Sequence, residues 1–116
     1  MDVIKKILEI EGYSSVEEIP MTDAITVSAP GFMDLTIEKV GEDRVSVAHY
    51  FKQNGDLMAD PEVVFDTADG WVPVQYRQDP VIRQVDESGL NIKSFLDTWN
   101  SNLRSQGFVD AAEADA

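Results

Sequence analysis

The residues best suited to chemistry lie in one short stretch that contains the only histidine of the chain. His49 is followed, within fourteen residues, by the carboxylates of Asp56, Asp60 and Glu62. A histidine oriented by Asp56 or Asp60 is the general base that a small hydrolase needs, and clustered carboxylates are ligands for hard cations. The structural explanation is a hairpin turn, a proline break and a histidine beside the core, and it is the one that we favour.

Other kinds of site have no support in the residues. The chain has no cysteine, which excludes disulfides, thiolate zinc sites and a cysteine nucleophile. A lone histidine lacks the further nitrogen or sulfur ligands of a transition-metal site, and the carboxylates do not have the spacing of an EF-hand loop. The glycines are dispersed and form no phosphate loop, and no serine lies in a G-x-S-x-G turn. We therefore expect no catalytic residue, no metal and no cofactor.

The same stretch is also a candidate binding surface, because it joins polar side chains to a predicted hairpin. The residues that we assign to this candidate functional surface are His49, Tyr50, Gln53, Asn54, Asp56, Asp60 and Glu62.

Strands are predicted to position this surface, because apolar and polar residues alternate from about residue 21 onward. In the central strand Val45, Val47 and His49 share one face, and Ser46 and Tyr50 lie on the other. We expect the helices to cover one face of the sheet and the other face to remain partly open to solvent or to a partner.

Turn residues divide the strands. Asn54-Gly55 is a strong signal for a two-residue hairpin, because a type I′ turn needs positive φ at both positions. Asp60-Pro61 predicts an edge, a bulge or a short loop, because proline donates no hydrogen bond to a sheet. Further strands are expected at residues 71–78 and 81–85.

Amphipathic helices are predicted at both ends of the chain. Residues 2–11 have apolar side chains at helical spacing, and near the other end a single apolar stripe is formed by Ile92, Phe95, Leu96, Trp99 and Leu103. Gly107 is a natural helix end, after which Phe108 folds back over the last turn. Residues 109–116 are short, acidic and alanine-rich, and we expect a frayed, flexible tail there.

Together these elements predict an α+β fold. An antiparallel β-meander of about five to six strands is packed on one face by an N-terminal and a C-terminal helix, in a single domain of residues 1–108.

Length and charge limit the classes of function. The chain has 116 residues, 22 of them acidic and 9 basic, for a formal net charge of −13. One domain is expected at this length, and the charge opposes direct contact with nucleic acid, since phosphate groups need clustered Lys and Arg. No apolar run approaches the ~20 residues of a membrane span, so we expect no membrane contact and a cytoplasmic location.

The acidity itself has two explanations. Dispersed carboxylates usually serve solubility. Alternatively, rows of them imitate the phosphates of DNA and occupy a basic groove on another protein. The rows that could present such a face are Asp34, Glu38, Glu42 and Asp43, or Asp60, Glu62, Asp66 and Asp69.

Several sequence strings carry a resemblance to a known family. They are H-Y-x-x-Q-N-G-D-L-M-x-D-P-E from His49 to Glu62, then Trp71-Val72-Pro73, Gln78-Asp79, Trp99, Asn102-Leu103 and Gln106-Gly107-Phe108. Over about residues 31 to 108 the chain resembles a family of small proteins, a domain of unknown function, encoded on bacterial plasmids, phages and integrative conjugative elements. The resemblance implies a mobile-element accessory protein of the bacterial cytoplasm, and it implies no catalytic residue.

Three functions are therefore considered. The first is a non-enzymatic protein-interaction module of a mobile element, which contacts a protein partner through the sheet face and hairpin of the candidate functional surface. The second is an acidic DNA mimic that inhibits a host nuclease or defence system. The third is a small hydrolase that uses His49 and a nearby carboxylate.

Overall fold

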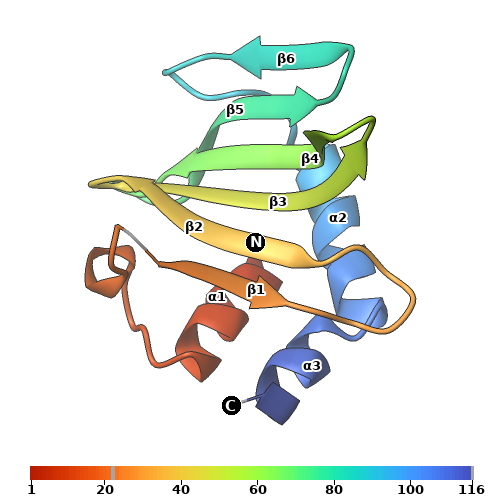
Figure 1. Cartoon of the computed structure of the whole chain (residues 1–116). Helices are drawn as coiled ribbons and strands as arrows, with labels where there is room; N and C mark the ends of the chain where they lie inside the picture. The colour runs from red at the N-terminus through yellow and green to blue at the C-terminus, as the bar shows by residue number, and fades with distance from the viewer. Residues whose placement is uncertain (22, 116) are drawn as a thin grey trace.

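A computed structural model describes residues 1–21 and 23–115 of the chain. Six strands form one sheet, and the helices lie against one side of it (Figure 1). In chain order the elements are α1 (Asp2–Ile10), the 3-10 turn η1 (Val16–Glu18), β1 (Ala24–Val27), β2 (Leu35–Gly41), β3 (Arg44–Gln53), β4 (Asp56–Asp66), β5 (Val72–Gln78), β6 (Ile82–Val85), α2 (Lys93–Ser105) and α3 (Phe108–Asp115).

The strands follow one another in space in the order of the chain, and each neighbouring pair is antiparallel. The predicted α+β meander is thereby confirmed. Asn54 and Gly55 have φ angles of 53° and 87°, and they close a two-residue hairpin in which Gln53 faces Asp56. This is the positive-φ turn that the Asn-Gly pair predicts.

The core lies between the sheet and the three helices. Side chains at alternate strand positions enter it, which is why Val45 and Val47 are fully buried beside the helices. The other large or central members of this core are Val3, Ile4, Ile7, Leu8, Leu35, Ile37, Val63, Phe65, Trp99, Leu103 and Phe108. In the described residues no helix is both long and apolar enough to cross a membrane.

The proline at position 61 produces a β-bulge inside one continuous strand. Ala48 pairs with Glu62, and Tyr50 pairs with Ala59, so that two residues of β4 lie opposite the single residue His49. A bulge was one of the three outcomes expected for Asp60-Pro61. Because the strand continues through it, β4 extends over eleven residues.

The C-terminal segment differs from the frayed tail that was expected at residues 109–116. Phe108–Asp115 forms α3, and Phe108 and Ala112 are 0% and 1% exposed. These two residues are four positions apart, so they share one face of a helix and reach the core together. Gly107, with a φ of 88°, turns the chain between α2 and α3. Residue 116 lies outside the described residues.

Candidate functional site

The seven residues of the candidate functional surface do not form one cluster. His49 points to the helix side of the sheet, whereas Tyr50 and Glu62 lie on the uncovered face and are hydrogen-bonded to each other. The remaining four are distributed over the bulge and the exposed hairpin tip, at Gln53, Asn54, Asp56 and Asp60.

His49 is held among aromatic rings. Its side chain is 7% exposed, with ring centroids 5.8 Å from Trp99 and 5.6 Å from Phe108. Nδ1 lies 3.1 Å from the backbone carbonyl oxygen of Asp34. A carbonyl oxygen only accepts hydrogen bonds, so Nδ1 carries the proton and donates it. In the neutral ring, Nε2 is then the acceptor that remains.

Asp56 and Asp60, the two carboxylates considered as partners of His49 in a hydrolase, lie at other positions in the hairpin. Asp56 faces Gln53 at the hairpin tip. Gln53 is four residues along β3 from His49, so the backbone separation is about 13 Å at the rise of an extended strand. Asp60 sits in the bulge, and no hydrogen bond joins either carboxylate to His49 within the part of the chain that is described. His49 is therefore oriented by a backbone carbonyl and not by a carboxylate.

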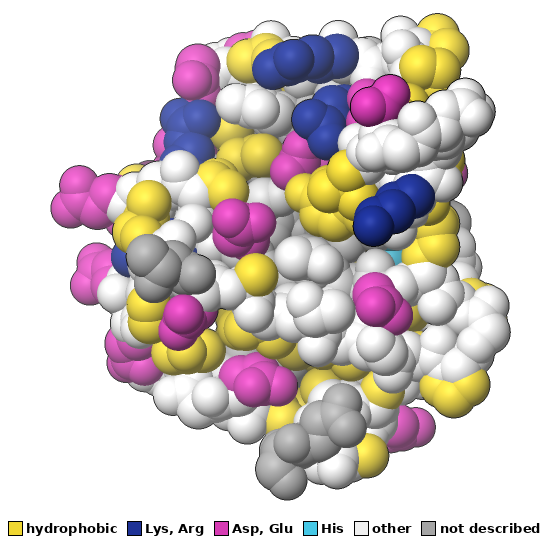
Figure 2. All heavy atoms as spheres, viewed as in Figure 1, with side chains coloured by type: hydrophobic (Ala, Val, Ile, Leu, Met, Phe, Trp, Pro, Cys, Tyr) yellow, Lys and Arg dark blue, Asp and Glu magenta, His cyan; other side chains and the backbone are white. Residues whose placement is uncertain are grey.

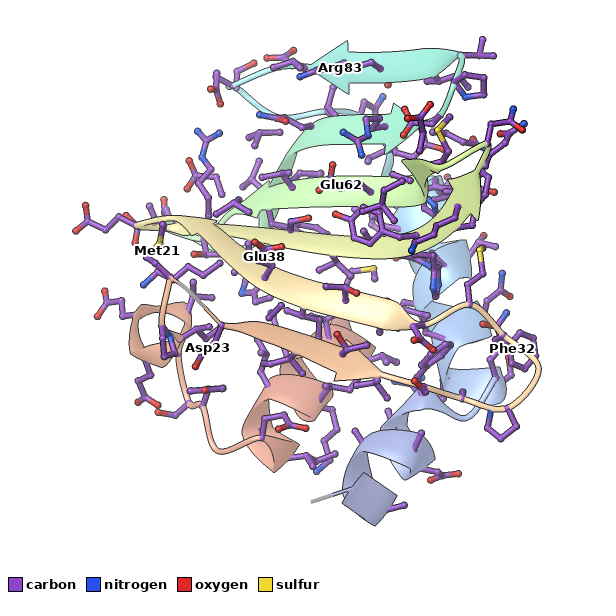
Figure 3. The ribbon with its side chains drawn as sticks, viewed as in Figure 1. Met21, Asp23, Phe32, Glu38, Glu62 and Arg83 are labelled. Atoms are coloured by element: carbon purple, nitrogen blue, oxygen red, sulfur yellow. The ribbon has the colours of Figure 1, made fainter. Side chains whose placement is uncertain are left out.

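Glu62 is the centre of a polar network on the uncovered face, where Figure 3 shows it near the middle of the sheet. Its Oε2 accepts hydrogen bonds from the Tyr50 hydroxyl at 3.1 Å and from the Ser46 hydroxyl at 2.6 Å. Burial, with the added negative charge of Glu62, raises the pKa of Tyr50 to about 12. The tyrosine therefore stays protonated and remains a donor at neutral pH.

An arginine on the next strand completes this network. Arg77 Nε lies 3.8 Å from Glu62 Oε1 and 3.3 Å from Asp79 Oδ2. Asp79 Oδ2 in turn accepts the backbone N–H of Ala59 at 2.8 Å, which ties the end of β5 to β4. Glu62 and its partners thus hold three neighbouring strands together.

A pocket opens beside His49 on the helix side. It has a volume of about 200 Å³ and is formed by the β1–β2 loop, the bulge of β4 and the end of α2. Its lining residues are Phe32, Met33, His49, Pro61, Trp99, Asn102 and Gln106. Trp99 is 6% exposed, and its indole N–H is buried without a hydrogen-bond partner in the structure as described.

Exposed hydrophobic side chains gather at the end of the sheet that carries the hairpin tip. Because consecutive strands are antiparallel, the β1–β2, β3–β4 and β5–β6 connections all lie at this end (Figure 1). Figure 3 shows Phe32 there, at the opposite end from Met21. We call this surface the hairpin end, and its exposed hydrophobic residues are Phe32, Met33, Leu57, Val81 and Ile82.

Carboxylates on the uncovered face are mixed with basic and apolar groups, as Figure 2 shows. Among the acidic rows considered above, Asp66 lies 3.4 Å from Arg44, and Glu62 is paired with Arg77. These pairs interrupt the row from Asp60 to Asp69. No group of three or more potential metal ligands occurs among the side chains that the structure describes.

Sequence reasoning missed most of the pocket and part of the network. Phe32, Met33 and Asn102 carry no motif and come together only through the fold. The contact between Arg77 and Glu62 had a usable signal in the sequence. Each residue occupies a polar position in the alternating pattern of its own strand, β5 or β4. Their pairing depends on the β4–β5 register, which shifts by one residue between Val64 and Phe65 and so cannot be counted directly from the turn.

Residues 2–109 match the family DUF6908, a domain of unknown function. The chain belongs to this family. The matched region includes α1 and its surroundings, so the DUF6908 domain extends further toward the N-terminus than residues 31 to 108, where the resemblance of the motifs is strongest. No curated protein and no solved structure matches the chain.

Proposed function

We propose that this DUF6908 protein is a non-enzymatic protein-interaction module whose partner binds at the hairpin end. One observation carries the proposal: of the eight large hydrophobic side chains that are exposed among the described residues, five belong to the hairpin end. Exposed apolar groups that collect on one surface are typical of interaction sites. The pocket beside His49 lies at the same end and offers a concave anchor point.

The setting of His49 favours binding over hydrolysis. A general base must reach both a substrate proton and the group that orients it. Here the ring is packed against Trp99 and Phe108, and its Nδ1 proton is directed to a backbone carbonyl. These contacts suit a fixed hydrogen-bonding group in a pocket wall.

The charge of the chain favours a basic partner. At a net charge of −13, a basic protein is attracted over distances of about one Debye length, ~8 Å at physiological salt. DNA mimicry would need a continuous ridge of free carboxylates, and the Glu62–Arg77 and Asp66–Arg44 pairs break the ridge on the uncovered face. In this proposal the negative charge of the chain speeds association with the basic partner, and the hairpin end forms the contact.

The setting that we propose is a bacterial mobile element, with the protein acting as an accessory factor in the cytoplasm. The support is the resemblance of the stretch from His49 to Glu62 to proteins encoded on plasmids, phages and integrative conjugative elements. A partner would then be a protein of the element or of its bacterial host.

Paired variants with matched exposure test the proposed surface. Phe32 and Leu57, 47% and 60% exposed, belong to the hairpin end, whereas Val40 and Val85, 45% and 54% exposed, lie at the other end of the sheet. The wild-type protein and the pairs Phe32→Ser/Leu57→Ser and Val40→Ser/Val85→Ser are immobilised and exposed to a bacterial lysate at low and high salt. Retained proteins are identified by mass spectrometry.

The expected result is a basic protein that the wild type and the Val40/Val85 pair retain and the Phe32/Leu57 pair loses. High salt should weaken its retention. The proposal is wrong if both pairs retain the same proteins as the wild type, or if only the Val40/Val85 pair loses a partner.

A further inference from the structure

The geometry points to a tyrosine side chain of the partner as the occupant of the pocket beside His49. The inference rests on the proposed function, because it names the group by which a protein partner is anchored at the hairpin end. It is carried by the size of the pocket, by its uncharged lining and by the polar atoms that its walls contain.

Size favours one side chain over a cofactor or metabolite. Pockets for small molecules usually have volumes of about 300–1,000 Å³, and this one has about 200 Å³. Phe32 and Met33, 47% and 41% exposed, form an apolar wall that a planar ring can contact. A tyrosine or tryptophan ring is a common anchor of protein interfaces, since it buries a large area at a low cost in conformational entropy.

The lining selects an uncharged occupant. None of the side chains that form the pocket is a carboxylate, an ammonium or a guanidinium group, although the chain has 22 acidic residues. Neither a lysine nor a glutamate side chain of the partner would find an opposite charge there. Burial of an unpaired charge is strongly unfavourable, so a neutral group is preferred.

The polar atoms of the walls distinguish tyrosine from the other aromatic residues. Because Nδ1 of His49 donates to the Asp34 carbonyl, Nε2 is the ring nitrogen left to accept a hydrogen bond. The indole N–H of Trp99 is buried and out of reach of a group in the pocket, but the amide groups of Asn102 and Gln106 also line its walls. A phenol hydroxyl can donate to Nε2 of His49 and accept from one of these amides. Phenylalanine can do neither, and tryptophan can only donate.

The pocket walls are held in place before a partner arrives. The Asp34 carbonyl bonded to His49 ties the β1–β2 loop to β3, and a turn in the same loop is closed by the Phe32 N–H, which donates to the Ala29 carbonyl at 3.2 Å. Preorganised walls reduce the ordering cost of binding.

A titration with amino-acid amides tests the occupant without needing the partner. N-acetyl-tyrosinamide, N-acetyl-phenylalaninamide and N-acetyl-lysinamide are added to isotope-labelled protein, and the indole N–H and histidine ring signals are followed by NMR. The tyrosine amide should shift the signals of Trp99 and His49 and leave the indole signal of Trp71 in place. The phenylalanine amide should bind about tenfold more weakly, the effect of one lost hydrogen bond. The lysine amide should not bind.

Two variants on adjacent positions of α2 provide the control. Asn102→Arg places a long side chain at the pocket, whereas Ser101→Arg adds the same charge on the exposed side of the helix. Only Asn102→Arg should abolish the shifts caused by the tyrosine amide. Both sites are exposed, so both variants should fold.

The outcomes separate this inference from the proposed function. Equal binding of the three amides, no shift at Trp99 and His49, or equal effects of the two variants would overturn the tyrosine anchor. A partner that depends on Phe32 and Leu57 but binds the Asn102→Arg variant normally would overturn it as well, and would leave the interaction module standing.

Discussion

Replacing Trp99 by alanine tests how the C-terminal helices are fixed to the sheet. Trp99 is 6% exposed, and its ring lies 5.8 Å from those of both His49 and Phe95. The Trp99→Ala variant removes the whole indole from this cluster and leaves a cavity that its neighbours fill only in part. Losses of this kind are about 3 to 5 kcal/mol in the free energy of unfolding.

Such a loss is large against the total stability of the protein. Domains of this size have unfolding free energies of about 5–15 kcal/mol, so the variant should lose about a fifth of its stability or more. With about 4 °C of melting temperature for each kcal/mol, the melting temperature should fall by about 12–20 °C. Urea denaturation followed by far-UV circular dichroism measures the change without depending on tryptophan fluorescence.

Trp99→Phe is the matched control. The indole N–H has no hydrogen-bond partner among the described residues, so phenylalanine retains an aromatic ring in the cluster and forfeits no hydrogen bond. Its loss of stability should be clearly smaller than that of Trp99→Ala. A loss below about 1 kcal/mol for Trp99→Ala would refute the packing argument. Equal losses for the two variants would show that a phenylalanine ring does not replace any of the packing of the indole.

Three further predictions concern other parts of the fold. Gly55→Ala should lower the free energy of unfolding by about 1–2 kcal/mol, because φ at this position is 87°. The added Cβ would meet no atom within 4 Å, so the penalty is conformational alone. Unchanged stability in urea would contradict this prediction. The folded pKa of Tyr50, about 12, lies above its ordinary value of 10.0. Its contribution to stability is therefore complete below pH 10 and lost as the pH rises toward 12, and in alkaline denaturation Tyr50→Phe should lack this loss. Ala112→Asp should destabilise the protein by about 2 kcal/mol or more and expose α3 to hydrogen exchange, whereas a frayed tail would tolerate the change.

The sheet was predictable because its signals are local. Alternation along β3 places Val45 and Val47 on the buried face, and Asn54-Gly55 sets both the turn and the register of the hairpin. The apolar stripe of α2 likewise follows from spacing alone, since Trp99 and Leu103 lie on one side of any helix built from this segment. Each of these features can be predicted from residues that lie close together in the sequence.

The last helix was not predictable in the same way. Residues 109–115 are acidic and lack a wide apolar face, and their hydrophobic pattern is weak. The helix is stabilised by Phe108 and Ala112, which contact a core assembled from residues distant in the sequence. Tertiary packing, more than local propensity, supplies most of the stability of short helices. A tail was therefore the expectation from local pattern, and the fold decides otherwise.

The adjacent residues His49 and Tyr50 show why a continuous motif does not imply a continuous site. Successive side chains of a strand point to opposite faces, so His49 enters the pocket beside the helices and Tyr50 joins Glu62 on the uncovered face. The stretch from His49 to Glu62 therefore contributes side chains to two different surfaces, the pocket beside the helices and the uncovered face of the sheet. The binding that we propose at the hairpin end should respond to changes around His49, while changes in the network of Tyr50, Glu62 and Arg77 should affect stability and leave binding intact.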